Sequence, residues 1–324
     1  MAGPIRVGTR ASTLALTQTT TVAERISSLA GRPYDLVRVR TEGDVLKGSL
    51  AQIGGTGVFV AALRDALLAG RCDLAVHSLK DLPTAPAPGL VLGAIPERAD
   101  TRDALCARDG LTLADLPERA TVGTGSPRRA AQLRAFRPDL VVVDIRGNVD
   151  TRLGRVAGMV PGGPGDLDAV VLAAAGLHRL GRKAVITEMI DPMLMLPAPG
   201  QGALAVECRS TGEDNGLGTA LAAYDHSASR LAVTAERAVL RRLEAGCAAP
   251  IGALARSDDT TLTLEAVVCS LDGQSVIRLS RSVAYCTDND GAHSAALRAA
   301  DQLGTSLAEE LLDAGAASIA PLTS

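Results

Sequence analysis

The sequence predicts an α/β protein with a small α+β domain at its carboxyl end. Apolar residues make up 47% of the 324 residues but aromatic residues only 2%, so the core must consist of Ala, Val, Leu and Ile, as in proteins with buried parallel strands. Short apolar runs alternate with amphipathic segments along most of the chain, which favours βαβ units. The final part instead holds three strand-like runs and one long helix. A chain of this length is typical of two or three domains.

The first strand is predicted at Ile5–Gly8, and a helix follows it with Ser12 as its N-cap. Arg10 therefore lies where the carboxyl end of a strand meets a helix start, which is the usual ligand position in open α/β sheets. An ordinary surface Arg is an equally good interpretation of this residue alone.

A long Gly-rich connection, residues 41–57, follows the strand predicted at Tyr34–Arg40 and precedes a helix at Val58–Ala69. Long loops in compact domains often act as lids. The GGTG stretch within it resembles a phosphate cradle only weakly, because it lacks the spacing and the Lys of a P-loop.

The buried strand at residues 73–76 is followed by four polar or charged side chains within residues 77–81. If the strand continues, residues 77, 79 and 81 face one side of the sheet and residues 78 and 80 the other. A Lys beside an Asp is usually a solvated pair. At the carboxyl edge of a sheet and beside a candidate lid, however, Lys80 and Asp81 become candidates for a functional role.

Residues 96–101 predict a crossing into a second domain. Its strands are predicted at Asp103–Ala107, Thr121–Thr124, Leu140–Ile145 and Asp168–Ala173. After the second of these, Ser126 is predicted as an N-cap and Pro127 suits the first helical position, which places Arg128 and Arg129 in the first turn. Cations there oppose the helix dipole by roughly several tenths of a kcal/mol each. The turn therefore predicts an anion site built from free N–H groups and guanidinium forks.

The next two strand ends also carry Arg side chains. Arg146 and Arg152 follow the third predicted strand, with Asn148 as a plausible N-cap, and Arg179 follows the fourth. Three Arg-bearing turns at equivalent positions predict a cleft for a polyanionic ligand.

Residues 196–209 predict a second crossover that returns the chain to the first domain. A helix at Ser227–Glu244 then leads into a short loop at Cys247, because Gly246 and Pro250 stop the helix. Free Cys is most often a buried apolar residue, so the loop alone leaves Cys247 open between an inert thiol and an attachment point. The carboxyl-terminal α+β domain follows, with strand-like runs at Ile251–Arg256, Leu262–Ser270 and Ser275–Ala284 and a helix near residues 290–314.

Composition argues against several classes of protein. The six Cys are scattered, with no Cys-x-x-Cys pair, which disfavours a metal site and a disulfide framework. The amino-terminal sequence has no signal-peptide core, and no apolar run approaches about 18 residues, so we expect a soluble cytoplasmic protein with no membrane partner. A net charge of −3 and few aromatic residues argue against nucleic acid as a partner.

Taken in order, the motifs of this chain resemble the porphobilinogen deaminase (hydroxymethylbilane synthase) family over nearly its whole length. Any one motif is weak evidence, but eight in register are highly specific. They are TRAS at 9–12, GGTGVF at 54–59, AVHSLKDLP at 75–83, GTGSPRR at 123–129, RGNVDTRL at 146–153, LAAAGLHRLG at 172–181, LPAPGQGA at 196–203 and ERAVLRRLEAGCAAPIG at 236–252.

The resemblance implies three domains. Two would resemble type II periplasmic binding proteins with a doubly crossed connection, and the third would be a small α+β domain. On this basis residues 1–97 and 199–217 form domain 1, residues 98–198 form domain 2, and residues 218–324 form domain 3, which carries the cofactor Cys.

The resemblance also implies a transferase of porphyrin and haem-type tetrapyrrole biosynthesis that acts as a monomer. The family condenses four porphobilinogen molecules head to tail, releases ammonia each time, and hydrolyses off the linear product 1-hydroxymethylbilane. Its cofactor, dipyrromethane, would be held by a thioether to Cys247, and Asp81 matches the catalytic Asp. The residues implied to bind carboxylates of substrate and cofactor are Arg10, Ser12, Ser78, Lys80, Ser126, Arg128, Arg129, Arg146, Arg152 and Arg179. The implied lid residues are Gly54, Gly55, Gly57 and Phe59.

Two departures from the family pattern concern the lid and the Cys loop. Thr56 and Gln52 stand where many members have Lys, so the lid of this chain is less basic. Ala249 replaces a more usual β-branched residue, which is a packing change. A non-catalytic protein that binds a carboxylate-rich metabolite is the alternative from another class. It predicts the Arg clusters but neither Asp81 at the strand end nor Cys247 on its loop. RNA binding through Arg fits poorly, since stacking aromatics are nearly absent.

Overall fold

A computed structural model describes residues 3–39, 57–210, 216–244, 249–258, 260–285 and 292–322, with the side chains of residues 57–59 left out. The chain divides into two compact units, Met1–Ala99 with Ala203–Arg230, and Asp100–Gly202 with Leu231–Ser324. The chain thus leaves the first unit after Ala99, returns at Ala203 and leaves again within a helix, which confirms the two predicted crossovers.

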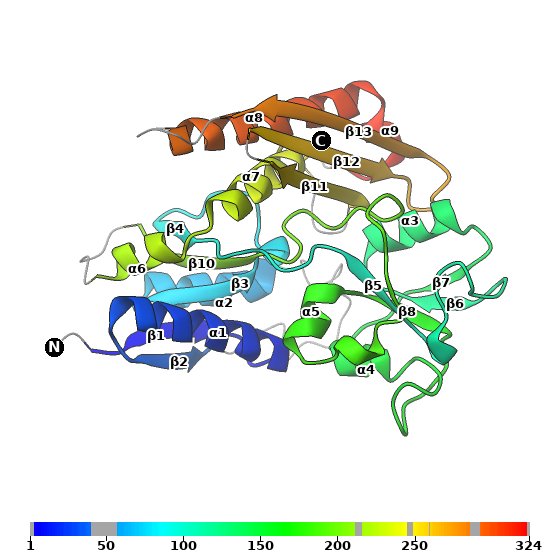
Figure 1. The fold of residues 1–324 in the computed structure, drawn as a ribbon, viewed down its shortest axis with the longest axis horizontal. Coiled ribbons are helices and arrows are strands. Elements are labelled where there is room, and N and C mark those ends of the chain that lie inside the picture. Colours follow the sequence, from blue (N-terminus) through cyan, green and yellow to red (C-terminus); the bar gives the residue numbers. More distant parts are fainter. Residues whose placement is uncertain are drawn as a thin grey trace. The chain divides into compact units, whose positions relative to one another are not determined.

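The first unit is built on a five-stranded mixed sheet in the order β2-β1-β3-β10-β4 (Figure 1). The strands are β1 (Ile5–Thr9), β2 (Tyr34–Arg38), β3 (Leu74–Ser78), β4 (Leu90–Ala94) and β10 (Leu204–Arg209). Strands β1, β2 and β3 are mutually parallel, whereas β10 runs antiparallel to β3 and β4. The carboxyl ends of β1 and β3 therefore meet at one edge of the sheet.

Helices cover this sheet because their apolar faces bury against it. They are α1 (Thr13–Ala30), α2 (Gly57–Leu68) and α6 (Leu217–Tyr224), and the next helix, α7 (Ser227–Arg242), runs from this unit into the second. One core cluster joins Val22 and Ile26 of α1 to Val7, Leu74 and Val206 of the sheet.

The second unit contains another five-stranded mixed sheet, in the order β7-β6-β8-β5-β9. Its strands are β5 (Asp103–Ala107), β6 (Thr121–Gly123), β7 (Val141–Val143), β8 (Ala169–Ala173) and β9 (Glu188–Met189). Strands β7, β6 and β8 run parallel, so their carboxyl ends share an edge, whereas β5 is antiparallel to β8. The first residue of β5, Asp103, pairs with the last residue of β8, Ala173, and so reaches the same edge.

The helices and 3₁₀ turns that accompany this sheet are short. They are η3 (Arg108–Gly110), α3 (Pro127–Phe136), α4 (Val149–Leu153), α5 (Ala174–Arg179) and η4 (Lys183–Val185).

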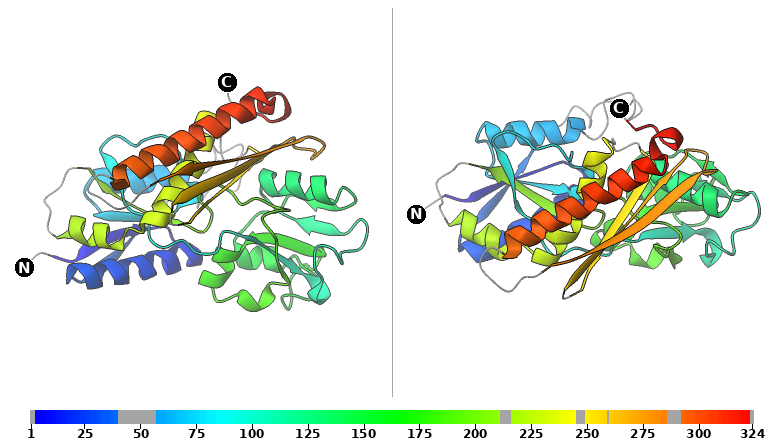
Figure 2. Two further views of the ribbon diagram at one scale, coloured as in Figure 1. Left: turned by 45° about the horizontal axis from the view of Figure 1, so that its top comes forward. Right: turned by 90° about the horizontal axis from the view of Figure 1, so that it is seen from above.

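The carboxyl-terminal segment adds a three-stranded antiparallel sheet, β11-β12-β13. It consists of β11 (Ile251–Ser257), β12 (Thr261–Cys269), β13 (Val276–Ala284), α8 (Ala292–Asp313) and α9 (Ala316–Ile319). Helix α8 lies across this sheet (Figure 2), and its apolar face shares a core with α7 and the strands. These elements confirm the predicted α/β fold with a small α+β domain, and the boundaries of the three domains stay a prediction.

The alternation of residues 77–81 depends on a strand that continues to Asp81, and this condition is not met. Strand β3 ends at Ser78, and Leu79–Asp81 form a 3₁₀ turn, η2. Residues 77–81 therefore do not alternate between the two faces of the sheet. The turn closes through the N–H of Leu82, which donates to the carbonyl of Leu79 at 3.0 Å, and Pro83 prevents the strand from resuming its ladder.

Candidate active site

The first unit gathers charged and hydroxyl side chains at the edge where β1 and β3 end. Arg10 follows β1, and Lys80 and Asp81 lie on the 3₁₀ turn that follows β3; all three are half-buried. Because β1 and β3 are parallel neighbours, these groups follow the carboxyl ends of adjacent strands at one edge of the sheet.

Helix α1 fixes this edge through polar contacts. Ser12 is the N-cap, and its side chain accepts from the N–H of Ala15 at 3.3 Å. One turn later, Gln18 Nε2 donates to Ser78 Oγ at 3.2 Å, and Thr19 donates to Thr9 at 2.8 Å. The start of the helix is thereby tied to the ends of both strands.

Behind the turn, a buried ion-pair group joins β3, α2 and β10. Glu207 accepts from Arg64 Nε and Nη2 at 3.1 and 2.9 Å, and His77 Nε2 lies 3.0 Å from its other oxygen. Burial disfavours the Glu207 carboxylate, but His77 and Arg64 outweigh that effect and hold its pKa below the usual range. The geometry of the His77 contact falls short of a hydrogen bond, so we regard it as an electrostatic contact.

In the second unit, α3 begins as predicted. Ser126 is the N-cap, Pro127 is the first helical residue, and the Ser126 side chain accepts from the N–H of Arg129 at 3.5 Å. Arg128 and Arg129 accordingly lie in the first turn, and both are buried.

The anion that these two guanidinium groups contact belongs to the chain itself. Asp103 of β5 accepts from Arg128 Nη1 at 2.8 Å and from Arg129 Nε and Nη2 at 2.9 and 2.8 Å. Burial works against the Asp103 carboxylate, yet the two neighbouring cations hold its pKa far below the usual range. No motif near Arg128 pointed to Asp103, because it comes from β5, the antiparallel neighbour of β8.

The other predicted Arg residues lie at the same edge, after β7 and β8. Arg152 donates to the carbonyl of Gly147 at 2.9 Å, and Arg179 to that of Gly202 at 2.7 Å, whereas Arg146 is exposed beside Asp144 at 3.2 Å. Burial lowers the pKa of Arg152, and the positive charges of Arg129 and Arg146 lower it further. Such mutual repulsion indicates that the guanidinium groups lie close together and suit an anionic ligand.

One atom in this group lacks an acceptor. Arg128 Nε is buried and has no hydrogen-bond partner among the residues that the structure describes, although its Nη1 binds both Asp103 and the carbonyl of Leu196. A carboxylate of a bound cofactor or substrate would supply the missing acceptor, since carboxylates bind guanidinium edges through two N–H groups. The residues present therefore fit a carboxylate-bearing group.

Two further residues that the sequence analysis missed fasten the crossover segment. Gln201 Nε2 donates to Asp103 Oδ1 and to the carbonyl of Thr101, both at 2.8 Å. Glu236 of α7 is fully buried and accepts from the N–H groups of Gly200 at 2.7 Å and Ala255 at 2.9 Å. Glu236 is four residues after Ala232 and three before Val239, so it falls on the apolar face of α7, and a charged residue on such a face was a signal that could have been used.

Several predicted site residues lie outside the described part of the chain. Cys247, Gly54 and Gly55 are among them, and so is the side chain of Phe59, whereas Gly57 begins α2. The attachment loop and the lid therefore stay predictions. Among the described residues, no cluster of His, Cys, Asp or Glu could hold a metal ion, and no helix is long and apolar enough to span a membrane.

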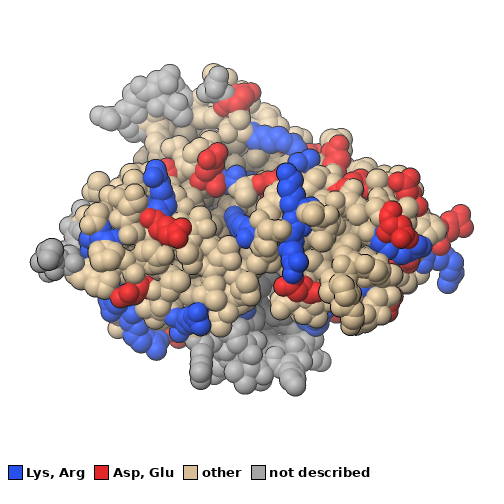
Figure 3. All heavy atoms as spheres, turned by 60° about the horizontal axis from the view of Figure 1, so that its bottom comes forward, with Lys and Arg blue, Asp and Glu red and all other residues tan. Residues whose placement is uncertain are grey.

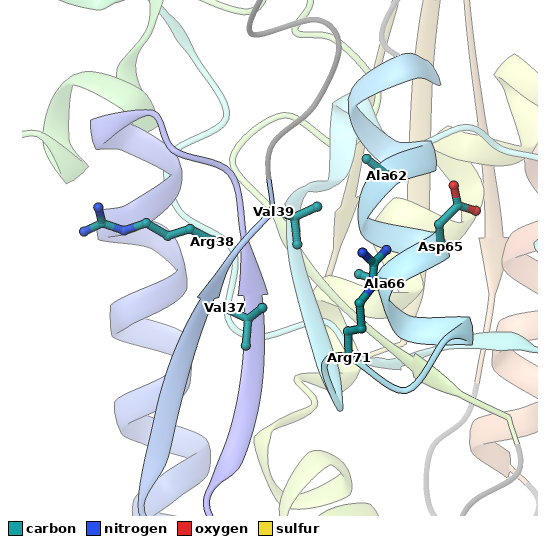
Figure 4. Close-up of a pocket in the computed structure, with 7 residues that line it drawn as sticks. All are labelled: Val37, Arg38, Val39, Ala62, Asp65, Ala66 and Arg71. Carbon is teal, nitrogen blue, oxygen red and sulfur yellow. The ribbon is translucent and has the colours of Figure 1, made fainter.

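A separate hollow of about 320 Å³ lies between β2 and α2. Figure 4 shows Val37 and Val39 facing Ala62 and Ala66 across it, while Arg38 points away. None of the predicted site residues lines this hollow. On the face drawn in Figure 3, basic and acidic side chains are interspersed.

Family models and relatives of similar sequence give one and the same family. A family model described as "Porphobilinogen deaminase, dipyromethane cofactor binding domain" matches residues 5–216, and one described as "Porphobilinogen deaminase, C-terminal domain" matches residues 230–313. A porphobilinogen deaminase of Cutibacterium acnes is 57% identical over 98% of this chain and 97% of its own length. One of Leifsonia xyli subsp. xyli is 58% identical over 99% and 95%.

Solved structures give weaker matches. The periplasmic aliphatic sulphonate binding protein SsuA from Escherichia coli is 14% identical with a TM-score of 0.37, over 74% of this chain and 70% of that one. A score this low supports no further argument.

Proposed function

This chain belongs to the porphobilinogen deaminase family, and on that premise we propose that it condenses four porphobilinogen molecules head to tail and releases the linear tetrapyrrole 1-hydroxymethylbilane. The observation that carries the chemistry is the place of Asp81, a carboxylate that directly follows Lys80 on the turn after β3, at the edge of the sheet where Arg10 follows the parallel strand β1. Each condensation step expels ammonia, and the last step adds water.

Recognition of the substrate rests on its two carboxylates. Porphobilinogen carries an acetate and a propionate side chain, so a growing chain is a ladder of negative charges. Guanidinium forks bind carboxylates through two parallel hydrogen bonds, and hydroxyl groups add single bonds. We assign this role at the first edge to Arg10, Ser12, Ser78 and Lys80. At the second edge we assign it to Ser126, Arg128, Arg129, Arg146, Arg152 and Arg179.

Asp81 has a different task. Loss of ammonia leaves a positive charge on the incoming pyrrole, and the new carbon–carbon bond leaves a proton to be removed. A carboxylate facing the pyrrole N–H groups stabilises the positive charge and takes up the proton. At about 4 Å and an effective dielectric near 20, one such charge contributes on the order of 4 kcal/mol, which corresponds to roughly a thousandfold in rate.

The cofactor that the family model names is dipyrromethane. We propose that the Cys247 thiol holds it as a thioether, since a thiolate is a soft nucleophile towards the carbon that loses ammonia. When bound, dipyrromethane supplies the free pyrrole carbon to which the first substrate is joined. The residues of this chain that would hold its carboxylates are the Arg groups of the second edge, where the Nε of Arg128 lacks an acceptor. By family resemblance we expect a cytoplasmic monomer.

Intact-mass measurement of the purified protein tests this proposal. We expect a covalent excess of two pyrrole units, located by peptide mapping on the fragment that contains Cys247, together with consumption of porphobilinogen. A matched Cys247→Ser variant should lack both, whereas Cys208→Ser, which changes a half-buried thiol of β10, should keep both. If the protein consumed porphobilinogen while its Cys247 was unmodified and open to alkylation, the proposal would be contradicted. An unmodified Cys247 in a protein without turnover would favour a protein that only binds carboxylate-rich metabolites.

A further inference from the structure

Asp103 occupies an unusual place for a carboxylate. It is fully buried, and it opens β5, the strand whose antiparallel pairing with β8 carries it to the Arg-bearing edge. Its backbone is held in the sheet between β8 and β9, and both of its carboxylate oxygens accept hydrogen bonds from side chains of the same unit. Asp103 is therefore a structural partner of the Arg residues.

The two oxygens of Asp103 have different partners. Oδ1 accepts from Arg129 Nε and Nη2 and from Gln201 Nε2, at 2.8 to 2.9 Å. Oδ2 accepts from Arg128 Nη1 at 2.8 Å. One side of the carboxylate thus holds Arg129 and the crossover segment, and the other side holds Arg128.

The contacts of Arg128 leave one edge of its guanidinium group for a ligand. Nη1 is used twice, by Asp103 Oδ2 and by the carbonyl of Leu196 at 2.6 Å, while the buried Nε has no acceptor among the described residues. Two guanidinium groups and one carboxylate also leave one net positive charge in a dry environment, where an unbalanced charge is costly. One carboxylate at the Nε edge of Arg128 would balance the net positive charge and would also accept a hydrogen bond from Nε.

We propose that Asp103 is a positioning residue for the reaction: its Oδ2 holds Arg128 by Nη1 so that the Nε edge is presented to a carboxylate of the cofactor or substrate. This inference rests on the proposed function. Asp103 itself touches neither molecule and acts through Arg128.

Asp103→Asn separates the two halves of the carboxylate. An Asn amide keeps one oxygen, which the three donors of Arg129 and Gln201 will retain, so its NH₂ group faces Arg128 Nη1, donor against donor. We expect Arg128 to lose its orientation and the variant to behave like Arg128→Gln. Two quantities are measured in each variant: the fraction of purified protein that carries the two-pyrrole mass, and the KM for porphobilinogen. At least one should worsen about tenfold or more, which corresponds to the loss of a charge-assisted hydrogen bond.

The double variant Asp103→Asn/Arg128→Gln gives the decisive comparison. If Asp103 acts through Arg128, the double variant should match Arg128→Gln in both quantities within about threefold, because coupled residues are not additive. Additive effects, a wild-type-like Asp103→Asn, or a wild-type-like Arg128→Gln would each overturn the inference. Should Asp103→Asn alone fail to fold, the double variant still decides, because it restores the single net positive charge of the wild-type cluster.

Asp168→Asn is the matched control. Asp168 forms a second Asp–Arg pair in the same sheet, at the opposite ends of the strands. It accepts from Arg108 Nε at 2.7 Å and from the N–H of Thr121 at 2.7 Å. Its loss should lower the melting temperature without changing KM or cofactor content. Wild-type protein without turnover and without the added mass would instead refute the proposed function, and so the two failures are distinguishable.

Discussion

Asp73 and Asp81 flank the two ends of strand β3, and the same substitution should have different effects at the two positions. Asp73 precedes the strand and accepts from Arg6 at its N–H and at Nη2, at 2.9 and 2.6 Å, whereas Asp81 is half-buried on the turn after it. We expect Asp81→Ala to fold but to lose turnover by roughly a thousandfold, since one favourable charge near the reacting atoms contributes on the order of 4 kcal/mol. The rate of porphobilinogen consumption measures this loss.

Asp73→Ala is the control for that experiment. It should lower the free energy of unfolding by about 1 to 3 kcal/mol, because the Arg6 side chain and backbone N–H lose their acceptor, and it should keep turnover near the wild-type value. Wild-type-like turnover in Asp81→Ala would remove Asp81 from its proposed role.

The positions of the Arg side chains at the second sheet could be predicted from the sequence, whereas the carboxylate that pairs with them could not. Arg128 and Arg129 follow from the Ser126-Pro127 helix start, because capping is local. Asp103 is 25 residues away from Arg128 along the chain, and only the antiparallel placement of β5 brings it to them. Local sequence rules cannot supply a contact that depends on strand order.

Helices α7 and α8 approach closely at a single glycine. Gly304 of α8 is buried, and a Cβ at this position would overlap the carbonyl oxygen of Ala235 and crowd the Cβ of Ala238 in α7. We expect Gly304→Ala to lower the free energy of unfolding by about 1 to 3 kcal/mol through overpacking, despite the better helix propensity of Ala. Thermal unfolding followed by far-ultraviolet circular dichroism is suitable, since the chain has no Trp.

Ser294→Ala, at an exposed position of the same helix, is the matched substitution and should stay within about 0.5 kcal/mol of wild type. If Gly304→Ala were as stable as this control, the two helices would have to be separated by more than the structure gives.

At the scale of elements, caps and apolar runs were enough to place most helices and strands. Ser12, Ser126 and Asn148 all cap the helices predicted for them, because each cap is set within four residues. The 3₁₀ turn at Leu79–Asp81 was not predicted, because the residues after Val76 do not by themselves show where the strand ends. The length of a strand depends on its neighbours, and β10 pairs with β3 only as far as Ser78.

For the whole molecule, the buried ion pairs set the response to acid. Burial works against the charged forms of Glu207, Asp103 and Asp73, but their cationic partners hold each pKa below the ordinary value. An unfolded chain has ordinary values, near 4, and therefore binds more protons than the folded chain in acid. Stability from these groups is fully present above the unfolded pKa and is lost as the pH falls through the folded one.

We therefore expect that these carboxylates cause no change in the melting temperature between about pH 8 and pH 5.5. Below about pH 4.5 the melting temperature should decrease as the carboxylates become protonated. Glu207→Gln should be less stable than wild type at neutral pH, because Arg64 loses its buried partner, and the difference should narrow in acid as wild type loses the same charge. Glu118→Gln, at an exposed position, should follow the wild-type curve. A Glu207→Gln curve parallel to that of wild type down to about pH 3 would show that the charge of Glu207 does not contribute to stability.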